Sequence, residues 1–291
     1  MNPALASSYA CCRRLARQKG TTYYWATALL PRERRPYVWA LYAFARYADD
    51  IVDDLDGRPA WERAAALWAL EQRFFADLDA GGSDHHVLAA VIDTVRSLRI
   101  DPECFERFLR SMRMDLSVHR YATWPDLLGY MDGSAAVIGE MMLPVLEPSS
   151  AAALEPARDL GLAFQLTNFL RDVDEDLERG RVYVPVEDLE RFGAEPARRC
   201  VDEAWRALMR FEIERNRELY RRADAGLPML HGAARRCVHT ARVLYAQILD
   251  RIEDGDFDVF SRRARVPTWR KLATVGGAMQ PLDLIGAARH A

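Results

Sequence analysis

The chain reads Gln165-Leu-Thr-Asn168-Phe-Leu-Arg171-Asp172-Val-Asp-Glu-Asp176 just past its middle. At about 100° per residue, polar side chains spaced three, four and four residues apart share one helical face, within an arc of about 80°. The opposite face is apolar and suited to burial in a core. The stretch therefore predicts a helix with a polar face of Gln165, Asn168, Asp172 and Asp176 and an apolar face of Leu166, Phe169, Leu170 and Val173.

A second acidic cluster follows the apolar run Val38–Leu41 and reads Tyr42-Ala-Phe-Ala-Arg46-Tyr-Ala-Asp49-Asp50-Ile-Val-Asp53-Asp54. On a helix, Asp49 and Asp53 point within about 40° of each other. Most charge runs on helices are solvated, but the apolar residues before this one indicate an inward face, where unpaired carboxylates are costly. Mg²⁺ bound together with a diphosphate relieves that cost, because this ion takes one or two carboxylates plus substrate phosphates. Arg46 and Arg171, one beside each cluster, suit a leaving diphosphate.

Helical periodicity recurs from end to end, and strand patterns are nearly absent, which predicts an all-α fold. Glycines and prolines mark the breaks between helices, and Asp101 and Ser149 are expected N-caps. No repeat, low-complexity tract or long linker divides the chain, so residues 1–291 are expected to form a single domain. The expected helices are Pro3–Arg17, Thr22–Leu30, Glu33–Leu55, Ala60–Ala80, His86–Leu98, Pro102–Ser117, Pro125–Leu146, Ser149–Glu178, Pro196–Ala223, His231–Ile252 and Pro267–Val275.

Composition excludes several classes of protein. Lys and Arg number 40 against 43 Asp and Glu, a net charge of −3, which argues against a general nucleic-acid binder. The five cysteines lack metal-ligand spacing and are expected to be reduced thiols in a cytoplasmic protein. No signal peptide is evident, and the longest apolar stretch, Ala135–Leu146, is too short to span a bilayer. Any membrane contact is therefore expected to be peripheral.

These motifs resemble the squalene/phytoene synthase family over nearly the whole chain. Tyr42–Asp53 is similar to the first aspartate-rich signature of that family, and Gln165–Pro185, including Arg181-Val-Tyr183-Val-Pro185, is similar to the second. Met114–Tyr121 and Tyr130–Gly139 are similar to its middle helices. The resemblance implies an isoprenoid-synthase-type helical bundle with a central cavity.

The implied reaction is the head-to-head condensation of two prenyl diphosphates through a cyclopropylcarbinyl diphosphate, with release of diphosphate. Two geranylgeranyl diphosphates giving phytoene is the first expectation, and the small residues Ala135, Ala136 and Gly139 are expected to leave room for long chains. The alternatives are a squalene- or dehydrosqualene-type synthase using farnesyl diphosphate, and a class I terpene cyclase. A head-to-tail prenyltransferase also fits Asp49-Asp50-Ile-Val-Asp53, but that class continues with paired aspartates where this chain has Asn168-Phe169.

The resemblance also implies roles for individual residues. The N-terminal segment departs from the family pattern, since Lys19-Gly20-Thr21-Thr22-Tyr23-Tyr24-Trp25 replaces a histidine motif; Trp25 is expected to pack in the core. Asp115 is expected to be a structural partner of an arginine. The implied metal ligands are Asp49, Asp53, Asn168, Asp172 and Asp176; the substrate contacts are Lys19, Gly20, Thr21, Thr22, Tyr42, Arg46, Gln165, Arg171, Tyr245 and Arg265; the catalytic residues are Tyr42, Arg46, Tyr130 and Arg171.

The implied cofactor is Mg²⁺, with Mn²⁺ as a substitute. NADPH is not expected to be required, because no Gly-rich dinucleotide fingerprint is present. The expected partners are prenyl diphosphate substrates, with no nucleic acid, and a membrane surface that receives the lipophilic product. A monomer or a homodimer is expected.

Overall fold

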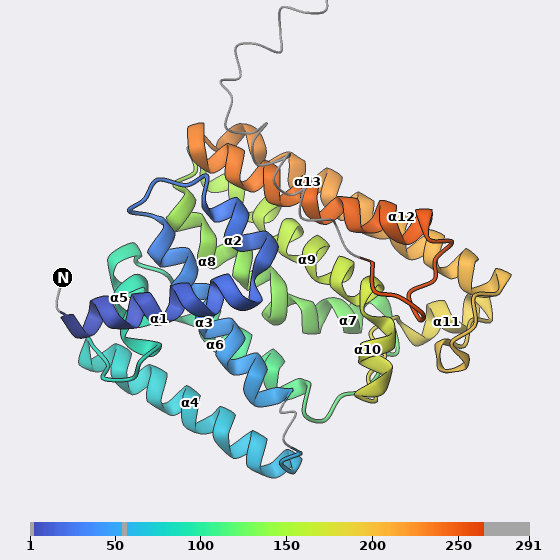
Figure 1. Cartoon of the computed structure of the whole chain (residues 1–291), viewed down its shortest axis with the longest axis horizontal. Coiled ribbons are helices and arrows are strands. Elements are labelled where there is room, and N and C mark those ends of the chain that lie inside the picture. Colours follow the sequence, from blue (N-terminus) through green and yellow to red (C-terminus); the bar gives the residue numbers. More distant parts are fainter. Residues whose placement is uncertain (1–2, 54–56, 265–291) are drawn as a thin grey trace, which may run out of the picture.

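The computed structural model describes residues 3–53 and 57–264, with residues 21–23 described by their backbone only. All regular structure in these residues is helical, apart from one isolated parallel β-bridge between Arg120 and Val182 (Figure 1). The all-α prediction is therefore confirmed for this part of the chain. The helices are α1 (Pro3–Lys19), α2 (Thr21–Thr27), α3 (Arg35–Val52), α4 (Ala60–Ala80), α5 (Leu88–Leu98), α6 (Pro102–Met114), α7 (Trp124–Met131), α8 (Val137–Leu146), α9 (Leu154–Arg171), α10 (Val173–Glu178), α11 (Val186–Phe192), α12 (Glu203–Asp224) and α13 (Gly232–Asp254).

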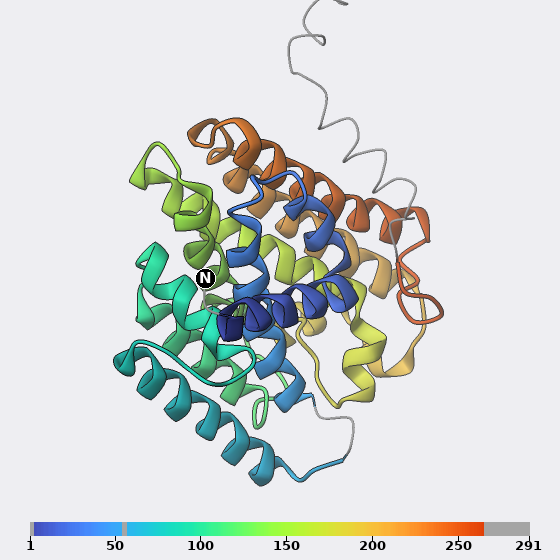
Figure 2. The same cartoon turned by 60° about the vertical axis from the view of Figure 1, so that its left-hand side comes forward.

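Helix α9 runs through the middle of the bundle in both views and packs against α8, α12 and α13 (Figures 1 and 2). It buries Leu166, Phe169 and Leu170, which confirms the apolar face expected from the sequence. Its buried Thr167 donates a hydrogen bond to the Ala163 carbonyl at 2.7 Å and accepts one from Asn216 of α12 at 2.8 Å. The polar face is different, because Gln165 and Asn168 stay half-buried although helices surround α9. Such partial access agrees with the expected central cavity, which stays a prediction.

Close backbone contacts fix α9 against the segment before it. Between α7 and α8 the chain forms a π-helical turn, Asp132–Ala136. A Cβ added at Gly161 of α9 would overlap the carbonyl oxygen of Ala135, and one added at Gly139 would overlap that of Ala157. The small residues of this segment therefore allow two helices to approach. The expectation that Gly139 leaves room for substrate chains is wrong, because the backbone of α9 occupies the space beside it. For the side chains of Ala135 and Ala136 the expectation stays a prediction.

The long helix expected over Ser149–Glu178 is broken at Asp172. Helix α9 ends at Arg171 and α10 begins at Val173, with Asp172 at φ −105° and ψ 18° between them. The physical reason is electrostatic: Asp174, Glu175 and Asp176 lie in the first turn of α10, where the partial positive charge of a helix N-terminus stabilises carboxylates. In one continuous helix these acids would lie near the C-terminal end and be disfavoured.

Other boundaries also differ from the expectations. The helix expected from Pro196 begins at Glu203, because the side chain of Asp202 accepts the backbone N–H of Trp205 at 2.9 Å and caps α12 there. Helix α11 was not expected. Asp101 caps α6 as predicted, whereas Ser150 rather than Ser149 caps the short turn before α9. The expected helix Pro267–Val275 lies outside the described residues.

No helix within residues 3–53 and 57–264 combines the length and the apolar composition that a membrane crossing requires.

We predict that Gly161→Ala destabilises the protein by about 1–3 kcal/mol, because the added methyl group meets the Ala135 carbonyl in a packed interior. Thermal or urea unfolding measures the change. The matched control is Gly129→Ala in α7, where an added Cβ meets nothing within 4 Å. That variant should be stabilised by up to about 1 kcal/mol, since alanine is the better helix former. Equal behaviour of the two variants would contradict the proposed contact.

Candidate active site

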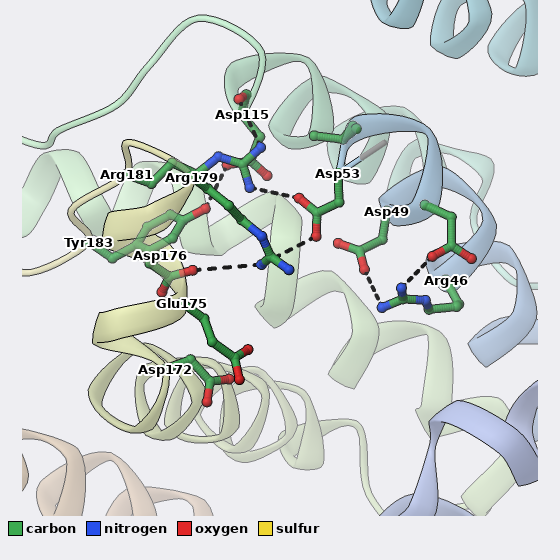
Figure 3. Close-up of polar contacts among 12 residues, drawn as sticks. Arg46, Asp49, Asp53, Asp115, Asp172, Glu175, Asp176, Arg179, Arg181 and Tyr183 are labelled. Carbon is green, nitrogen blue, oxygen red and sulfur yellow. Dashed lines mark hydrogen bonds and ion pairs between the residues drawn. The ribbon is translucent and has the colours of Figure 1, made fainter. Parts of the chain in front are cut away.

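Two acidic motifs from distant parts of the chain face each other across the bundle (Figure 3). The first, at the end of α3, carries Asp49 and Asp53, and the second, at the α9–α10 break, carries Asp172 and Asp176. Arg179 lies between them: its Nη1 atom is 3.6 Å from Asp53 Oδ2 and 4.0 Å from Asp176 Oδ1. The fold thus brings together the two clusters that the sequence singled out.

The first motif is paired with its own arginine. Arg46 Nη1 donates to Asp49 Oδ2 at 2.8 Å, and Nη2 pairs with Asp50 one turn along the helix. Burial and the charge of Asp53 raise the pKa of Asp49 to about 7, although 39% of the Asp49 side chain stays accessible. A carboxylate in this position is ready to take a cation, because its charge is only partly compensated.

The second motif is held by two arginines. Arg171 donates to both carboxylate oxygens of Asp172, at 2.7 and 2.5 Å. Arg263, from the segment after α13, makes the same pair of bonds from the other side, at 2.8 and 2.7 Å, and lies 3.1 Å from Glu175.

Arg263 was missed at the sequence level. Arg265 was expected instead, and it lies outside the described residues. The run Ser261-Arg262-Arg263-Ala264-Arg265 signals a basic contact, but only the path of the chain decides which arginine reaches the site.

The donor set around these motifs fits a hard divalent cation. The Oδ1 atom of Asn168 is buried and has no hydrogen-bond partner in the described part of the chain, while Nδ2 donates to Gln165 at 3.4 Å. An unpaired buried acceptor is costly, and a metal ion would satisfy it. Burial and the charge of Asp172 raise the pKa of Asp176 to about 8. Carboxylate and amide oxygens without thiols or imidazoles are the ligands that Mg²⁺ prefers.

The acidic side chains do not by themselves close a metal cage. Within residues 3–53 and 57–264, no three His, Cys, Asp or Glu side chains converge on one point suited to a metal ion. Arginines keep the carboxylates apart instead. Mg²⁺ usually retains open positions for substrate phosphates, so a site completed by diphosphate is compatible with this spacing.

Several of the expected substrate-binding residues gather around Tyr42, since Gly20, Arg46 and Tyr245 all lie near it. Gly20 follows α1 and lies against Tyr42, so that a Cβ there would come within 2.8 Å of the Tyr42 ring. Burial raises the pKa of Tyr42 to about 12, which keeps its hydroxyl protonated at neutral pH. Tyr245 of α13 packs on Phe164 of α9, with ring centroids 4.4 Å apart. Lys19 is exposed at the end of α1.

Three more residues of the N-terminal segment lie in α2. Thr21 and Thr22 begin α2, and only their backbone is described. Trp25 is 36% exposed, so its expected burial in the core is wrong. The reason is that α2 is only seven residues long and packs on α1, α3 and α13, which leaves part of the Trp25 side chain uncovered.

Asp115 is the centre of a buried hydrogen-bond network next to the first motif. Tyr130 is 2% exposed and donates its hydroxyl hydrogen to Asp115 at 2.7 Å, and Tyr183 donates to the same carboxylate at 3.1 Å. Arg181 Nη2 donates to the backbone carbonyl of Asp115 at 3.3 Å, so an arginine lies beside Asp115, although the carboxylate itself is bonded by the two tyrosines. Arg181 thus connects the buried carboxylate that Tyr130 contacts to Asp53, and the implied catalytic role of Tyr130 stays a prediction.

Comparisons with known proteins agree with this geometry. A family model described as squalene/phytoene synthase matches residues 16–270. A 15-cis-phytoene synthase of Synechococcus elongatus is 36% identical over 95% of this chain and 94% of its own length. A phytoene synthase of Arthrospira platensis is 39% identical over 93% of this chain and 92% of its own. The solved structure of a dehydrosqualene synthase in complex with ligand superposes with a TM-score of 0.85 at 26% identity, over 94% of this chain and 96% of that one.

We predict that the metal-free protein loses stability as the pH rises from about 4 to about 8. Asp176 holds its proton more tightly in the folded state than in the unfolded chain, so the folded state is favoured at low pH, and this advantage is lost as the pH rises through the folded-state pKa. Asp176→Asn should flatten the pH dependence of Tm measured in EDTA. Asp174→Asn, which removes a carboxylate paired with Arg199 near the surface, is the matched control and should follow the wild type. Identical pH profiles for all three proteins would refute the effect of burial at Asp176.

Proposed function

The chain belongs to the squalene/phytoene synthase family, and from this premise we propose that it joins two geranylgeranyl diphosphates head to head, giving phytoene and diphosphate. One observation carries the proposal: two acidic motifs, each paired with arginines, face each other inside a helical bundle. Relatives named phytoene synthase span nearly the whole chain, which favours this product over squalene- or dehydrosqualene-type products from farnesyl diphosphate and over a cyclised product.

The residues proposed to hold Mg²⁺, or Mn²⁺ in its place, are Asp49, Asp53, Asn168, Asp172 and Asp176. When bound, the metal supplies positive charge that stabilises the leaving diphosphate. Arg46 and Arg171 are already placed beside these ligands and bind the diphosphate oxygens through their planar guanidinium groups. Tyr42 stays protonated at neutral pH and donates a hydrogen bond to the same group. Gln165 orients Asn168 through its side-chain oxygen.

The apolar side of the site serves the prenyl chains. Phe164 and Tyr245 pack together with ring centroids 4.4 Å apart and a tilt of 36° between the ring planes, and their ring faces are proposed to stabilise a developing allylic cation by cation–π attraction. The double bond of the second chain attacks that cation, and a proton is lost as the cyclopropane ring closes. The resulting cyclopropylcarbinyl diphosphate then ionises in the same place. Because the reaction ends by proton loss rather than hydride delivery, NADPH is not required. Lys19, Gly20, Thr21 and Thr22 are proposed to contact the second diphosphate, and Arg265 the first.

We predict that the enzyme, supplied with Mg²⁺ and an equimolar mixture of farnesyl and geranylgeranyl diphosphates, forms phytoene without NADPH. Product mass analysis measures the outcome. A preference for the C15 substrate would assign the chain to the squalene-type branch, and a cyclised product from a single substrate would assign it to the cyclases.

The metal dependence is tested in the same assay. EDTA should stop turnover and added Mg²⁺ should restore it. Asp49→Ala should lower turnover by at least about 100-fold, since even partners outside the first ligand shell typically contribute 10–100-fold. Asp174→Ala is the control and should keep activity, because Asp174 pairs with Arg199 away from the opposing motif. Full activity after exhaustive chelation would remove the metal from the mechanism.

We further propose that the protein contacts a lipid surface through the outer face of α4, which lies at the edge of the bundle (Figures 1 and 2). Trp61 and Trp68 are 70% and 60% exposed and lie two turns apart, with exposed alanines between them. Tryptophan suits the interface between lipid and water, because its ring is apolar and its N–H is polar. Phytoene carries no polar group, so it needs an apolar environment on release.

We predict that Trp61→Ala/Trp68→Ala abolishes co-sedimentation with phospholipid vesicles while turnover in detergent is kept. Leu154→Ala removes another exposed apolar side chain, 41% accessible, and serves as the control. Unchanged vesicle binding would reject the α4 surface. A dimer that becomes monomeric in the double variant, measured by light scattering, would instead identify this face as a subunit contact.

A further inference from the structure

We propose that Arg181 is a positioning residue that couples the two acidic motifs and thereby sets the distance between their carboxylates. Its backbone N–H donates to the carbonyl of Asp176 in the second motif at 2.8 Å. Its side chain reaches across, and Nη1 donates to Asp53 Oδ1 in the first motif at 2.8 Å (Figure 3). One residue therefore bonds to both motifs, which lie more than 100 residues apart in the chain. The inference rests on the proposed function.

The guanidinium is fixed at its other end. Arg181 Nη2 donates to the backbone carbonyl of Asp115 at 3.3 Å, and only 9% of the side chain is accessible. Asp115 is itself held by the hydroxyl groups of Tyr130 and Tyr183. Tyr183 stacks on Phe169 of α9 with ring centroids 3.9 Å apart. The direction in which Arg181 points is thus determined by packed groups rather than by solvent.

The backbone around Arg181 is pinned as well. The Val182 N–H donates to the His119 carbonyl and the Val186 N–H to the Tyr121 carbonyl, both at 2.9 Å. These bonds accompany the β-bridge between Arg120 and Val182. A two-point anchor of this kind limits how far the second motif can move relative to the first.

Arg179 and Arg181 contact Asp53 in different ways. Arg181 bonds to Oδ1 from a buried position, whereas Arg179 lies 3.6 Å from Oδ2 with 39% of its side chain accessible. Because Arg179 is exposed, it would be able to move aside if Asp53 took part in holding a cation. The buried Arg181 would keep Asp53 oriented, as hydrogen-bonding partners orient ligating carboxylates in other metal sites.

The test is calorimetric titration of Mg²⁺ into the full-length protein in the presence of inorganic diphosphate, with Tm measured in parallel. Arg181→Met should weaken Mg²⁺ binding about 10- to 100-fold. Arg181→Lys keeps the charge beside Asp53 but cannot also span to the Asp115 carbonyl, so it should recover only part of that loss. Arg217→Met removes ion pairs to Glu253 and Asp250 between α12 and α13 and is the matched control. It should lower Tm at most and leave Mg²⁺ binding unchanged.

The outcomes separate the alternatives. A lower Tm with unchanged Mg²⁺ affinity in Arg181→Met would overturn the positioning role and leave a structural one. Tighter Mg²⁺ binding would also overturn it, since Arg181 would then be a competitor of the metal. If Arg181→Met does not fold, the Mg²⁺ affinity of Arg181→Lys is the deciding measurement. An Mg²⁺ affinity equal to that of the wild type in Arg181→Lys would reject the proposal. Failure of the wild type itself to bind Mg²⁺ with diphosphate would instead count against the proposed function.

Discussion

The repulsion among carboxylates inside the bundle is the constraint on which the rest of the structure depends. Asp53 and Asp176 are largely withdrawn from water, and the charge of Asp53 acts on both Asp49 and Asp176. Such a group must either keep its proton, as Asp176 does below a pKa of about 8, or have cations close to it, because burial of an uncompensated charge costs several kcal/mol or more. Arginine side chains accordingly pair with the aspartates of both acidic motifs. The same arrangement leaves the carboxylates ready to exchange an arginine for a metal ion and a diphosphate.

The arginines that compensate the buried carboxylates come from separate segments of the chain, so these segments must all pass close to the two acidic motifs. Arg46 lies on α3 and Arg171 at the end of α9, each beside its own aspartates. Arg179 and Arg181 follow α10 and reach back to the first motif. Arg263 arrives from the segment after α13 and contacts the second. The charges that make the site tolerable therefore also connect the first third of the chain to its C-terminal part.

Much of this could be predicted from the sequence, and the rest could not, for identifiable reasons. Helical periodicity and carboxylate spacing are local properties, so the all-α class and both acidic motifs are readable. The contact of Arg181 with Asp53 spans 128 residues and depends on the turn after α10, which no local pattern encodes. The role of Gly139 was misjudged for a similar reason: a small residue can leave space for a ligand or for a neighbouring backbone, and only the packing of α9 distinguishes the two.

The break between α9 and α10 at Asp172 connects the local sequence pattern to the long-range contact between Arg181 and Asp53. A continuous helix would have kept Asp172 and Asp176 in register on one rigid face, with the acidic run at its unfavourable end. Ending α9 at Arg171 starts a new helix whose first turn is acidic, and the backbone bond from Asp176 N to Asp172 O, at 2.9 Å, keeps the two aspartates one turn apart. The break also directs the chain after α10 back toward α3, which is how Arg181 reaches Asp53. Local electrostatics at the second motif thus shapes the connection to the first.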